Sequence, residues 1–287
     1  MDIAVIGAGR VGTALAVAWS RAGHRVVAVA GRGATAERAG RFLPGVPVLN
    51  ANEAASRGEL VAVTVPDQAI PGVVAQLVGP GAIGDRQVVL HVSGASGLSP
   101  LEEAERSGAS TIALHPLQSF PSVEAGLERL PGSAMAVTAR DEETFAFGEQ
   151  LARDAGCTPF RIADEARPLY HAAAVFAANY VATTMILADR LFRAAGIADP
   201  VPLFAPLTRA VLENVVAMGP AAALTGPAAR GETSTIQRNL EAIGEVEPEA
   251  IAPYVALARA ALAVAEREGR LSADDRSRME EVLANWT

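Results

Sequence analysis

The first twelve residues constrain this chain more than any other stretch. An apolar run from Asp2 to Ile6 leads directly into Gly7-Ala8-Gly9-Arg10-Val11-Gly12, and a helical pattern follows as far as Ala22. In a strand–turn–helix unit the first glycine permits a tight turn, the second lets the backbone approach a pyrophosphate, and the third lets the helix pack on the strand. The helix N-terminus then faces the anion. We therefore predict that these six residues bind a dinucleotide.

The end of the second strand indicates which dinucleotide this is. A strand is predicted over 25–30, and it is followed by Gly31-Arg32-Gly33. NAD-binding folds place an Asp or Glu here to hold the ribose 2′-hydroxyl. A guanidinium instead matches a 2′-phosphate with two hydrogen bonds. Arg32 therefore predicts NADP(H), with Thr35 and Arg38 as helpers; the alternative is an arginine that only meets solvent.

The later strand signals predict an α/β fold with a doubly wound parallel sheet. Short apolar runs alternate with helical or turn-rich segments, which is typical of a sheet covered on both faces. Beyond Ile162 the strand signals stop and the pattern is helical, so we predict an NADP-binding domain over 1–163 and an all-α domain for substrate binding or dimerisation over 164–287. The further strands are expected at 60–65, 87–91, 111–114, 133–139 and 159–162, and the helices at 142–155, 167–195, 202–218, 234–243, 249–268 and 272–286.

Composition narrows the partners and the compartment. The net charge of −8 leaves no basic footprint for nucleic acid or an anionic membrane surface. Cys157 is the only cysteine and the chain begins with a strand, which favours the cytoplasm. Residues 168–188 contain no Asp, Glu or Arg but are mostly alanine with polar interruptions, so we expect a helix buried in a core or a subunit interface, and a homodimer, rather than a membrane span.

Candidate site residues follow the predicted strands at their carboxyl ends, where open α/β sheets bind ligands. We expect Val65 and Pro66 to wall the nicotinamide or its ribose, and Asp67 to cap the next helix. Gln118, in the turn after a later strand, is a candidate for binding substrate. No metal site is predicted.

Ser93 and His115 end neighbouring strands and should therefore lie close together. Hydride transfer to C=O or C=N requires a proton at the heteroatom, and histidine suits this because its ordinary pKa is near 6.5. His115 is our first choice as proton donor, with Ser93 bonded to it or to the substrate. The alternative is a histidine that caps backbone groups in a proline-containing turn. His91 is expected to be a buried strand-end residue.

The helical half offers further candidates. His171 and Asn179 are eight positions apart and would share one helix face, either reaching the cleft or satisfying a helix-packing interface. Arg230, in the Gly/Pro-rich loop 225–231, could hold a substrate carboxylate or could simply meet solvent. All 24 basic residues are arginine, so a mechanism that needs a lysine proton donor is excluded.

Several motifs together resemble an uncharacterised bacterial family of Rossmann-like NADP-binding proteins with a C-terminal helical domain of unknown function. These are the glycine pattern at 7–12, His91-Val92-Ser93-Gly94, the stretch 115–120, Tyr170-His171-Ala172-Ala173 and the loop 225–231. That family is similar to F420-dependent NADP oxidoreductases and pyrroline-5-carboxylate reductases. The resemblance implies the fold and the cofactor but not a substrate.

The function expected is that of an NADP(H)-dependent oxidoreductase acting on a small oxo- or imino-acid, with the proton from His115 or His171. A ketopantoate-like reduction would need a histidine in place of that family's lysine. One alternative is a prephenate-like dehydrogenase, because prephenate dehydrogenases resemble this chain in carrying a serine after one strand and a His-Pro after the next, here Ser93 and His115-Pro116. Another is a non-catalytic sensor that binds NADP(H).

Overall fold

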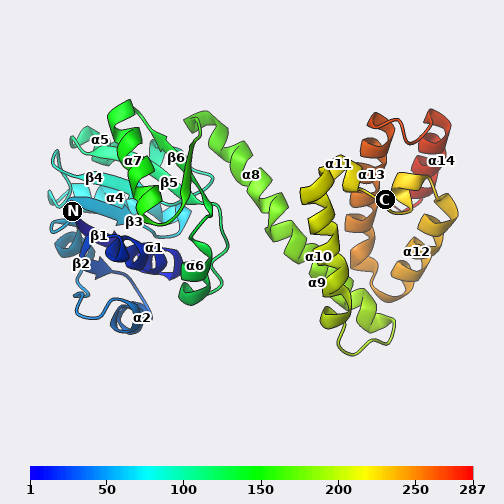
Figure 1. The fold of residues 1–287 in the computed structure, drawn as a ribbon, viewed down its shortest axis with the longest axis horizontal. Helices are drawn as coiled ribbons and strands as arrows, with labels where there is room; N and C mark the ends of the chain where they lie inside the picture. Colours follow the sequence, from blue (N-terminus) through cyan, green and yellow to red (C-terminus); the bar gives the residue numbers. More distant parts are fainter. Residues whose placement is uncertain (287) are drawn as a thin grey trace. The chain divides into compact units, whose positions relative to one another are not determined.

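The chain folds into two compact units. The computed structural model describes residues 1–286; the first unit spans Met1–Asn179 and the second begins at Tyr180. Figure 1 shows a sheet flanked by helices in the first unit and helices alone in the second. The elements of the first unit are β1 (Asp2–Ile6), α1 (Arg10–Arg21), β2 (Arg25–Ala30), α2 (Thr35–Phe42), α3 (Ala51–Ala55), β3 (Leu60–Val63), η1 (Asp67–Ala69), α4 (Ile70–Val78), β4 (Val88–His91), η2 (Ser99–Leu101), α5 (Glu102–Arg106), β5 (Ser110–Pro116), α6 (Val123–Arg129), β6 (Ala134–Ala139), α7 (Glu142–Asp154), β7 (Thr158–Arg161), η3 (Asp164–Ala166) and α8 (Arg167–Ala177).

The sheet confirms the predicted α/β architecture with one difference in strand direction. Its seven strands lie in the order β2-β1-β3-β4-β5-β6-β7, and neighbours are parallel except β5 and β6. The link between these two strands contains only α6, whose seven residues span about 10 Å. After this link β6 runs antiparallel to β5, with Ala113 opposite Thr138. The first half of the sheet stays parallel and keeps its carboxyl ends together.

Two apolar clusters cover the two faces of the sheet. One packs α1, α6 and α7 against alternate strand residues such as Val5 and Ile112. The other packs α3, α4 and α5 against the intervening residues such as Ile6 and Val63. Because both faces are buried, the strands read as continuous apolar runs in the sequence, which is why the pattern predicts them well.

The second unit has a small core formed by its last helices. Its core includes Ile236, Leu240, Leu262 and Met279, from three helices, whereas α9 has no buried residue and α10 has only Phe204. Its elements are α9 (Asn179–Ala194, whose first residue still belongs to the first unit), α10 (Val201–Met218), α11 (Pro220–Ala223), η4 (Ala228–Arg230), α12 (Thr233–Val246), η5 (Pro248–Ala250), α13 (Ile251–Arg267) and α14 (Ala273–Ala284).

The helix predicted over 167–195 is two helices. α8 ends at Ala177 and α9 begins at Asn179, because Ala178 leaves the helical region with φ −128° and ψ −65°. α8 belongs to the first unit, beyond the boundary near Ala163 that the sequence suggests. Three segments of the described chain are long and apolar enough to cross a membrane: 164–194, 201–218 and 248–267.

Candidate functional site

The glycine turn between β1 and α1 leaves room for an anion. Gly7 has φ +97°, and a Cβ there would lie 2.6 Å from the Val65 side chain. A Cβ on Gly9 would meet nothing closer than 3.7 Å, so this face of the turn is open. α1 begins with no side-chain cap and no acidic residue in its first turn. Its first N–H groups and dipole are therefore available to a pyrophosphate, and the turn fits the predicted dinucleotide.

Arginines lie beside this turn. Arg32 follows β2 and is exposed, while its carbonyl accepts a hydrogen bond of 2.9 Å from Thr35 Oγ1. Arg38, on α2, donates from Nε to the carbonyl of Ala8 at 3.0 Å. The rest of the Arg38 guanidinium thus lies next to the glycine turn, on the element that follows Arg32. This arrangement suits a nucleotide that carries an additional phosphate on its ribose.

The end of β3 supports the glycine turn from the other side. Thr64 donates from Oγ1 to the carbonyl of Gly7 at 2.8 Å, and Val65 packs on Gly7. Pro66 follows and is exposed. The sequence predicts that Asp67 caps the next helix, and this prediction is wrong: its side chain makes no cap. The Oδ2 atom of Asp67 instead accepts a hydrogen bond of 2.6 Å from Ser93 Oγ. The carboxyl ends of β3 and β4 are therefore joined through polar side chains.

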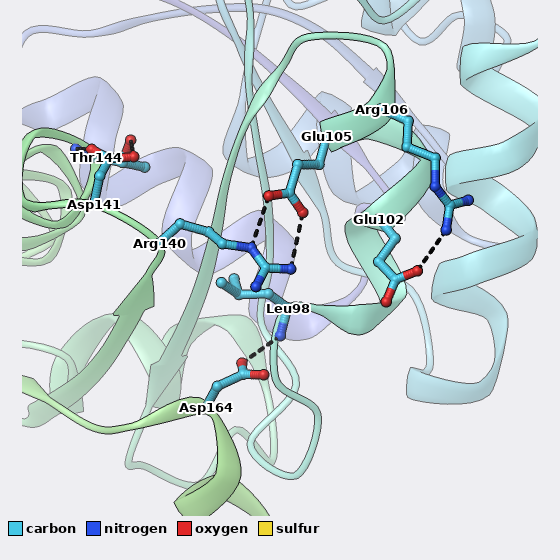
Figure 2. A network of polar contacts seen from close by, with 8 residues as sticks. All are labelled: Leu98, Glu102, Glu105, Arg106, Arg140, Asp141, Thr144 and Asp164. Atoms are coloured by element: carbon cyan, nitrogen blue, oxygen red, sulfur yellow. Dashed lines mark hydrogen bonds and ion pairs between the residues drawn. The ribbon is translucent and has the colours of Figure 1, made fainter.

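The turn after β4 is held by the buried His91 and by Asp164 in η3, the short helix before α8. His91 is fully buried; its Nδ1 accepts from the Ser93 N–H at 3.1 Å, and its Nε2 lies 2.7 Å from the carbonyl of Gly97. Asp164 in η3 accepts from the Leu98 N–H at 2.7 Å, a contact visible in Figure 2. His91 thus closes the turn internally, as expected of a buried strand-end residue.

His115, at the end of β5, lies within a cluster contributed by three segments. Its Nδ1 is 2.8 Å from the Tyr170 hydroxyl, and its ring makes an edge contact with His171 at 6.0 Å between centroids. A Cβ built on Gly94 would lie 2.8 Å from His115 Nε2 and 2.6 Å from His171 Nδ1. Gly94 therefore has to be glycine for the two imidazoles to occupy these positions. The His171 Nδ1 is buried and has no hydrogen-bond partner in residues 1–286.

The charge state of these groups follows from burial. Burial is the main cause that lowers the pKa of His115 to about 4; the Arg167 guanidinium and His171 add to the effect, and Asp67 opposes it. Burial likewise lowers the pKa of His91 to about 4. Burial raises the pKa of Tyr170, against the influence of Arg167. At neutral pH the imidazole of His115 is uncharged, and the Tyr170 hydroxyl can donate its proton to Nδ1 while Nε2 carries the ring proton.

The predicted site residues fall into two groups. Ser93, His115 and His171 lie around the turn after β4, but Ser93 Oγ bonds Asp67 and the Ser96 N–H rather than His115. The remaining three have other surroundings. Gln118 is exposed and bonds Ser133 and Ser119, Asn179 begins α9 after the break at Ala178, and Arg230 of the second unit donates to Glu232 at 2.6 Å. Residues 1–286 hold no cluster of His, Cys, Asp or Glu arranged to bind a metal ion.

Two residues of this cluster were not singled out from the sequence. Tyr170 stands in the Tyr-His pair, yet only the structure shows that its hydroxyl contacts His115. Arg167 is fully buried at the start of α8, where the sequence offers nothing to distinguish it from the other arginines. The His115–Tyr170 pair joins β5 to α8, and no spacing in the sequence predicts a contact between two residues this far apart.

Two family models match the chain. Residues 1–116 match a Rossmann-like domain, and residues 133–261 match a domain of unknown function named DUF2520. These matches confirm the pairing of a Rossmann-like domain with a C-terminal domain of unknown function that the motifs suggest. Among proteins of curated function, none matches the chain.

Solved structures share the fold at low identity. A protein from Bacteroides fragilis, described as a proposed NADP oxidoreductase, is 23% identical to this chain. The two structures have a TM-score of 0.78 over 91% of this chain and 97% of the other. A reductive aminase from Aspergillus terreus, in complex with NADPH and ethyl levulinate, is 17% identical, with a TM-score of 0.69 over 98% of both chains. A prephenate dehydrogenase from Aquifex aeolicus is 16% identical, with a TM-score of 0.53 over 67% of this chain and 71% of its own.

Proposed function

We propose that this chain is an NADP(H)-dependent oxidoreductase that reduces a small oxo- or imino-acid at the carboxyl edge of its sheet. The observation that carries the proposal is the pair formed by His115 and Tyr170, placed beside Gly94 on the same sheet edge as the open glycine turn. The folds shared with a reductive aminase bound to NADPH and with a protein described as an NADP oxidoreductase support this class of chemistry.

The cofactor would be held by elements of the first unit. The pyrophosphate would sit on the turn 7–12 and the N–H groups of α1, and the 2′-phosphate would pair with Arg32. Val65 and Pro66, which follow β3, would lie against the nicotinamide end. When bound, NADPH would supply the hydride.

The protonation state of His115 favours a C=N substrate over a C=O substrate. A ketone accepts hydride only if a proton reaches its oxygen, and an uncharged His115 can give its Nε2 proton only as Tyr170 replaces it at Nδ1. A protonated imine already carries that proton on nitrogen. The site also places the Asp67 carboxylate near Ser93, which suits a cationic substrate. We therefore favour an imine within the proposed substrate class.

A matched pair of substrates tests this proposal. NADPH oxidation is followed with a small cyclic imine and with the ketone of the same skeleton, for the native protein and for Tyr170→Phe. The proposal expects faster reduction of the imine, and loss of roughly tenfold or more in ketone reduction alone on removing the hydroxyl. Equal losses with both substrates would contradict the relay.

The same assay separates the alternatives. A prephenate-like dehydrogenase would reduce NADP⁺ with a hydroxylated substrate and leave NADPH unused. A non-catalytic sensor would bind NADPH tightly without oxidising it in the presence of any C=N or C=O compound. His24→Ala is the matched histidine control, because His24 lies just before β2, pairs with Asp154 at 2.7 Å and touches none of the proposed machinery.

We also propose that the helical unit mediates a homodimer in the cytoplasm, without a membrane or nucleic-acid partner. Leu203, Leu207 and Val216 on α10 are 60%, 66% and 81% exposed, and Ile186 on α9 is 56% exposed. α9 and α10 also line an open apolar hollow of about 680 Å³. Side chains of this kind on a soluble protein need a cover, and a second copy supplies the same apolar helices.

A further inference from the structure

Within residues 1–286, Arg167 is a buried cation without a carboxylate partner. It is the first residue of α8 and has no exposed surface. Nε donates to Thr138 Oγ1 at 2.9 Å, one terminal nitrogen donates to the carbonyl of Ser93 at 2.8 Å, and the other donates to the carbonyls of Ala113 at 2.6 Å and Ala136 at 3.4 Å. Within residues 1–286 its hydrogen-bond acceptors are thus three carbonyls and one hydroxyl.

These four acceptors lie in the turn after β4 and on the strands β5 and β6. The Ser93 carbonyl lies in the turn that carries Gly94, and Ala113 lies two residues before His115 on β5. Thr138 and Ala113 are paired across β5 and β6, where the sheet changes from parallel to antiparallel. Arg167 itself begins the helix that carries Tyr170 and His171. One guanidinium therefore joins the turn, the strand pair and the helix.

Stability alone does not explain an arginine in this place. Burying a charge without a counter-ion is unfavourable, and apolar residues of similar volume commonly serve a fold as well or better. The one carboxylate that acts on Arg167 through space is that of Asp164, after a larger influence of Tyr170, and Asp164 accepts its hydrogen bond from the Leu98 N–H instead. Because burying the charge of Arg167 is unfavourable, its place next to the candidate site points to a role in that site.

We propose that Arg167 is a positioning residue of the reaction proposed above: it fixes the geometry in which Tyr170 meets His115 beside Gly94, and it places a positive charge behind that pair. This inference rests on the proposed function, since a positioning residue needs a reaction to serve. The guanidinium of Arg167 acts on the site through its hydrogen bonds to backbone carbonyls and through its charge. Arg167 does not itself touch the substrate.

The charge has a consequence that can be measured without turnover. The groups that act on His115 are Tyr170, His171 and Arg167 from α8, Asp67 from η1 and His91 from β4. After burial, Arg167 is the largest influence that lowers the pKa of His115, and Asp67 opposes it. Removing the guanidinium charge should therefore raise the pKa of His115.

The experiment compares Arg167→Met with Arg167→Lys. The pKa of His115 is measured by NMR titration of its imidazole protons, and NADPH affinity reports whether the first unit is folded. We expect Arg167→Met to raise the pKa of His115 by about one unit and to abolish most turnover of the ketone substrate. Arg167→Lys should keep the low pKa but recover only part of kcat, because an ammonium cannot span the three carbonyls. An unchanged pKa and an unchanged pH profile in Arg167→Met would overturn the proposal.

Two further variants keep the outcome decisive. Arg140→Met removes an arginine charge from the residue that follows β6, but Arg140 is exposed and bonded twice to Glu105 (Figure 2), so the pKa of His115 should not change. If Arg167→Met does not fold, Thr138→Val decides: it removes one hydrogen bond of Arg167 but keeps the charge, so kcat should fall while the pKa stays low. Full kcat in Thr138→Val would then overturn the proposal. Absence of turnover in the native protein would refute the proposed function but leave the NMR result interpretable.

Discussion

His115 is the residue on which the proposed chemistry depends most. Its Nδ1 contacts Tyr170 and its Nε2 faces Gly94, whereas His91 has both nitrogens occupied by backbone groups. In the described part of the chain, only His115 and His171 therefore have a ring nitrogen available beside the turn after β4. A proton delivered to a substrate at this edge would come through one of these two imidazoles.

We expect His115→Ala to lower kcat for the ketone substrate by roughly 10²–10⁴-fold and to leave the Kd for NADPH unchanged, as for loss of a general acid away from the phosphates. His171→Ala is measured beside it, with His24→Ala as the control. If only the His171 change abolishes turnover, the proton comes from α8 and His115 has a positioning role. Full rates in both variants on a verified ketone substrate would refute both assignments.

Sequence reasoning located these residues but not their partners. Strand ends at Ser93 and His115 predicted that both would reach one edge, since parallel strands deliver their carboxyl ends together. Of the two bonds expected of Ser93, to His115 or to the substrate, the bond to His115 is absent: Ser93 bonds Asp67, and His115 bonds Tyr170. The side-chain partners depend on which face of α8 meets the turn after β4 and on the buried Arg167. Neither feature leaves a periodic signal in the sequence.

At the scale of elements, apolar periodicity predicted strands and most helices because each is buried on definite faces. β2 matches its predicted range and β4 differs by one residue. The direction of β6 was not predicted, because a buried apolar strand has the same residue pattern whether it runs parallel or antiparallel to its neighbour. The break at Ala178 was also missed, since alanine favours a helix and the sequence there contains neither glycine nor proline.

The turn after β4 provides a prediction at this scale. Gly94→Ala places a methyl group within 3 Å of both His115 Nε2 and His171 Nδ1, so the turn or the imidazoles must shift. We expect turnover to fall at least about tenfold while NADPH affinity is kept, because displacements of this size misalign reacting groups. Gly40→Ala, in α2 with nothing within 4 Å of the added methyl, is the matched control and should keep full activity. Equal activity in both variants would contradict the assigned geometry.

For the whole molecule, two buried histidines predict how stability changes with pH. The folded protein keeps His91 and His115 unprotonated down to about pH 4, whereas the unfolded chain protonates histidine near pH 6.5. The unfolded state therefore binds more protons between these values, and the free energy of unfolding falls as pH is lowered, by up to about 3 kcal/mol for each histidine. Urea unfolding at pH 7, 6 and 5 measures this. A constant free energy of unfolding across that range would contradict the burial of both imidazoles in their neutral form.

The apolar helices α9 and α10 predict the oligomeric state. Their exposed leucine and valine side chains are expected to be covered by a second copy, so light scattering in detergent-free buffer should give a dimer at micromolar concentration. Leu207→Glu and Val216→Glu on α10 should shift the protein toward monomer, while Glu213→Gln on the same helix should not. A stable native monomer would refute the dimer, and insolubility without detergent would instead favour a membrane role for the segments that are long enough to span one.

The central claim is that the first unit binds NADPH with the 2′-phosphate on Arg32, and a fluorescence titration with NADPH and NADH tests it most directly. We predict a Kd for NADPH at least about tenfold below that for NADH, since the arginine–phosphate pair contributes about 1.5–3 kcal/mol. Arg32→Ala should remove this preference by weakening NADPH alone. Equal affinities for the two cofactors in the native protein, or NADPH binding unchanged in Arg32→Ala, would contradict the account.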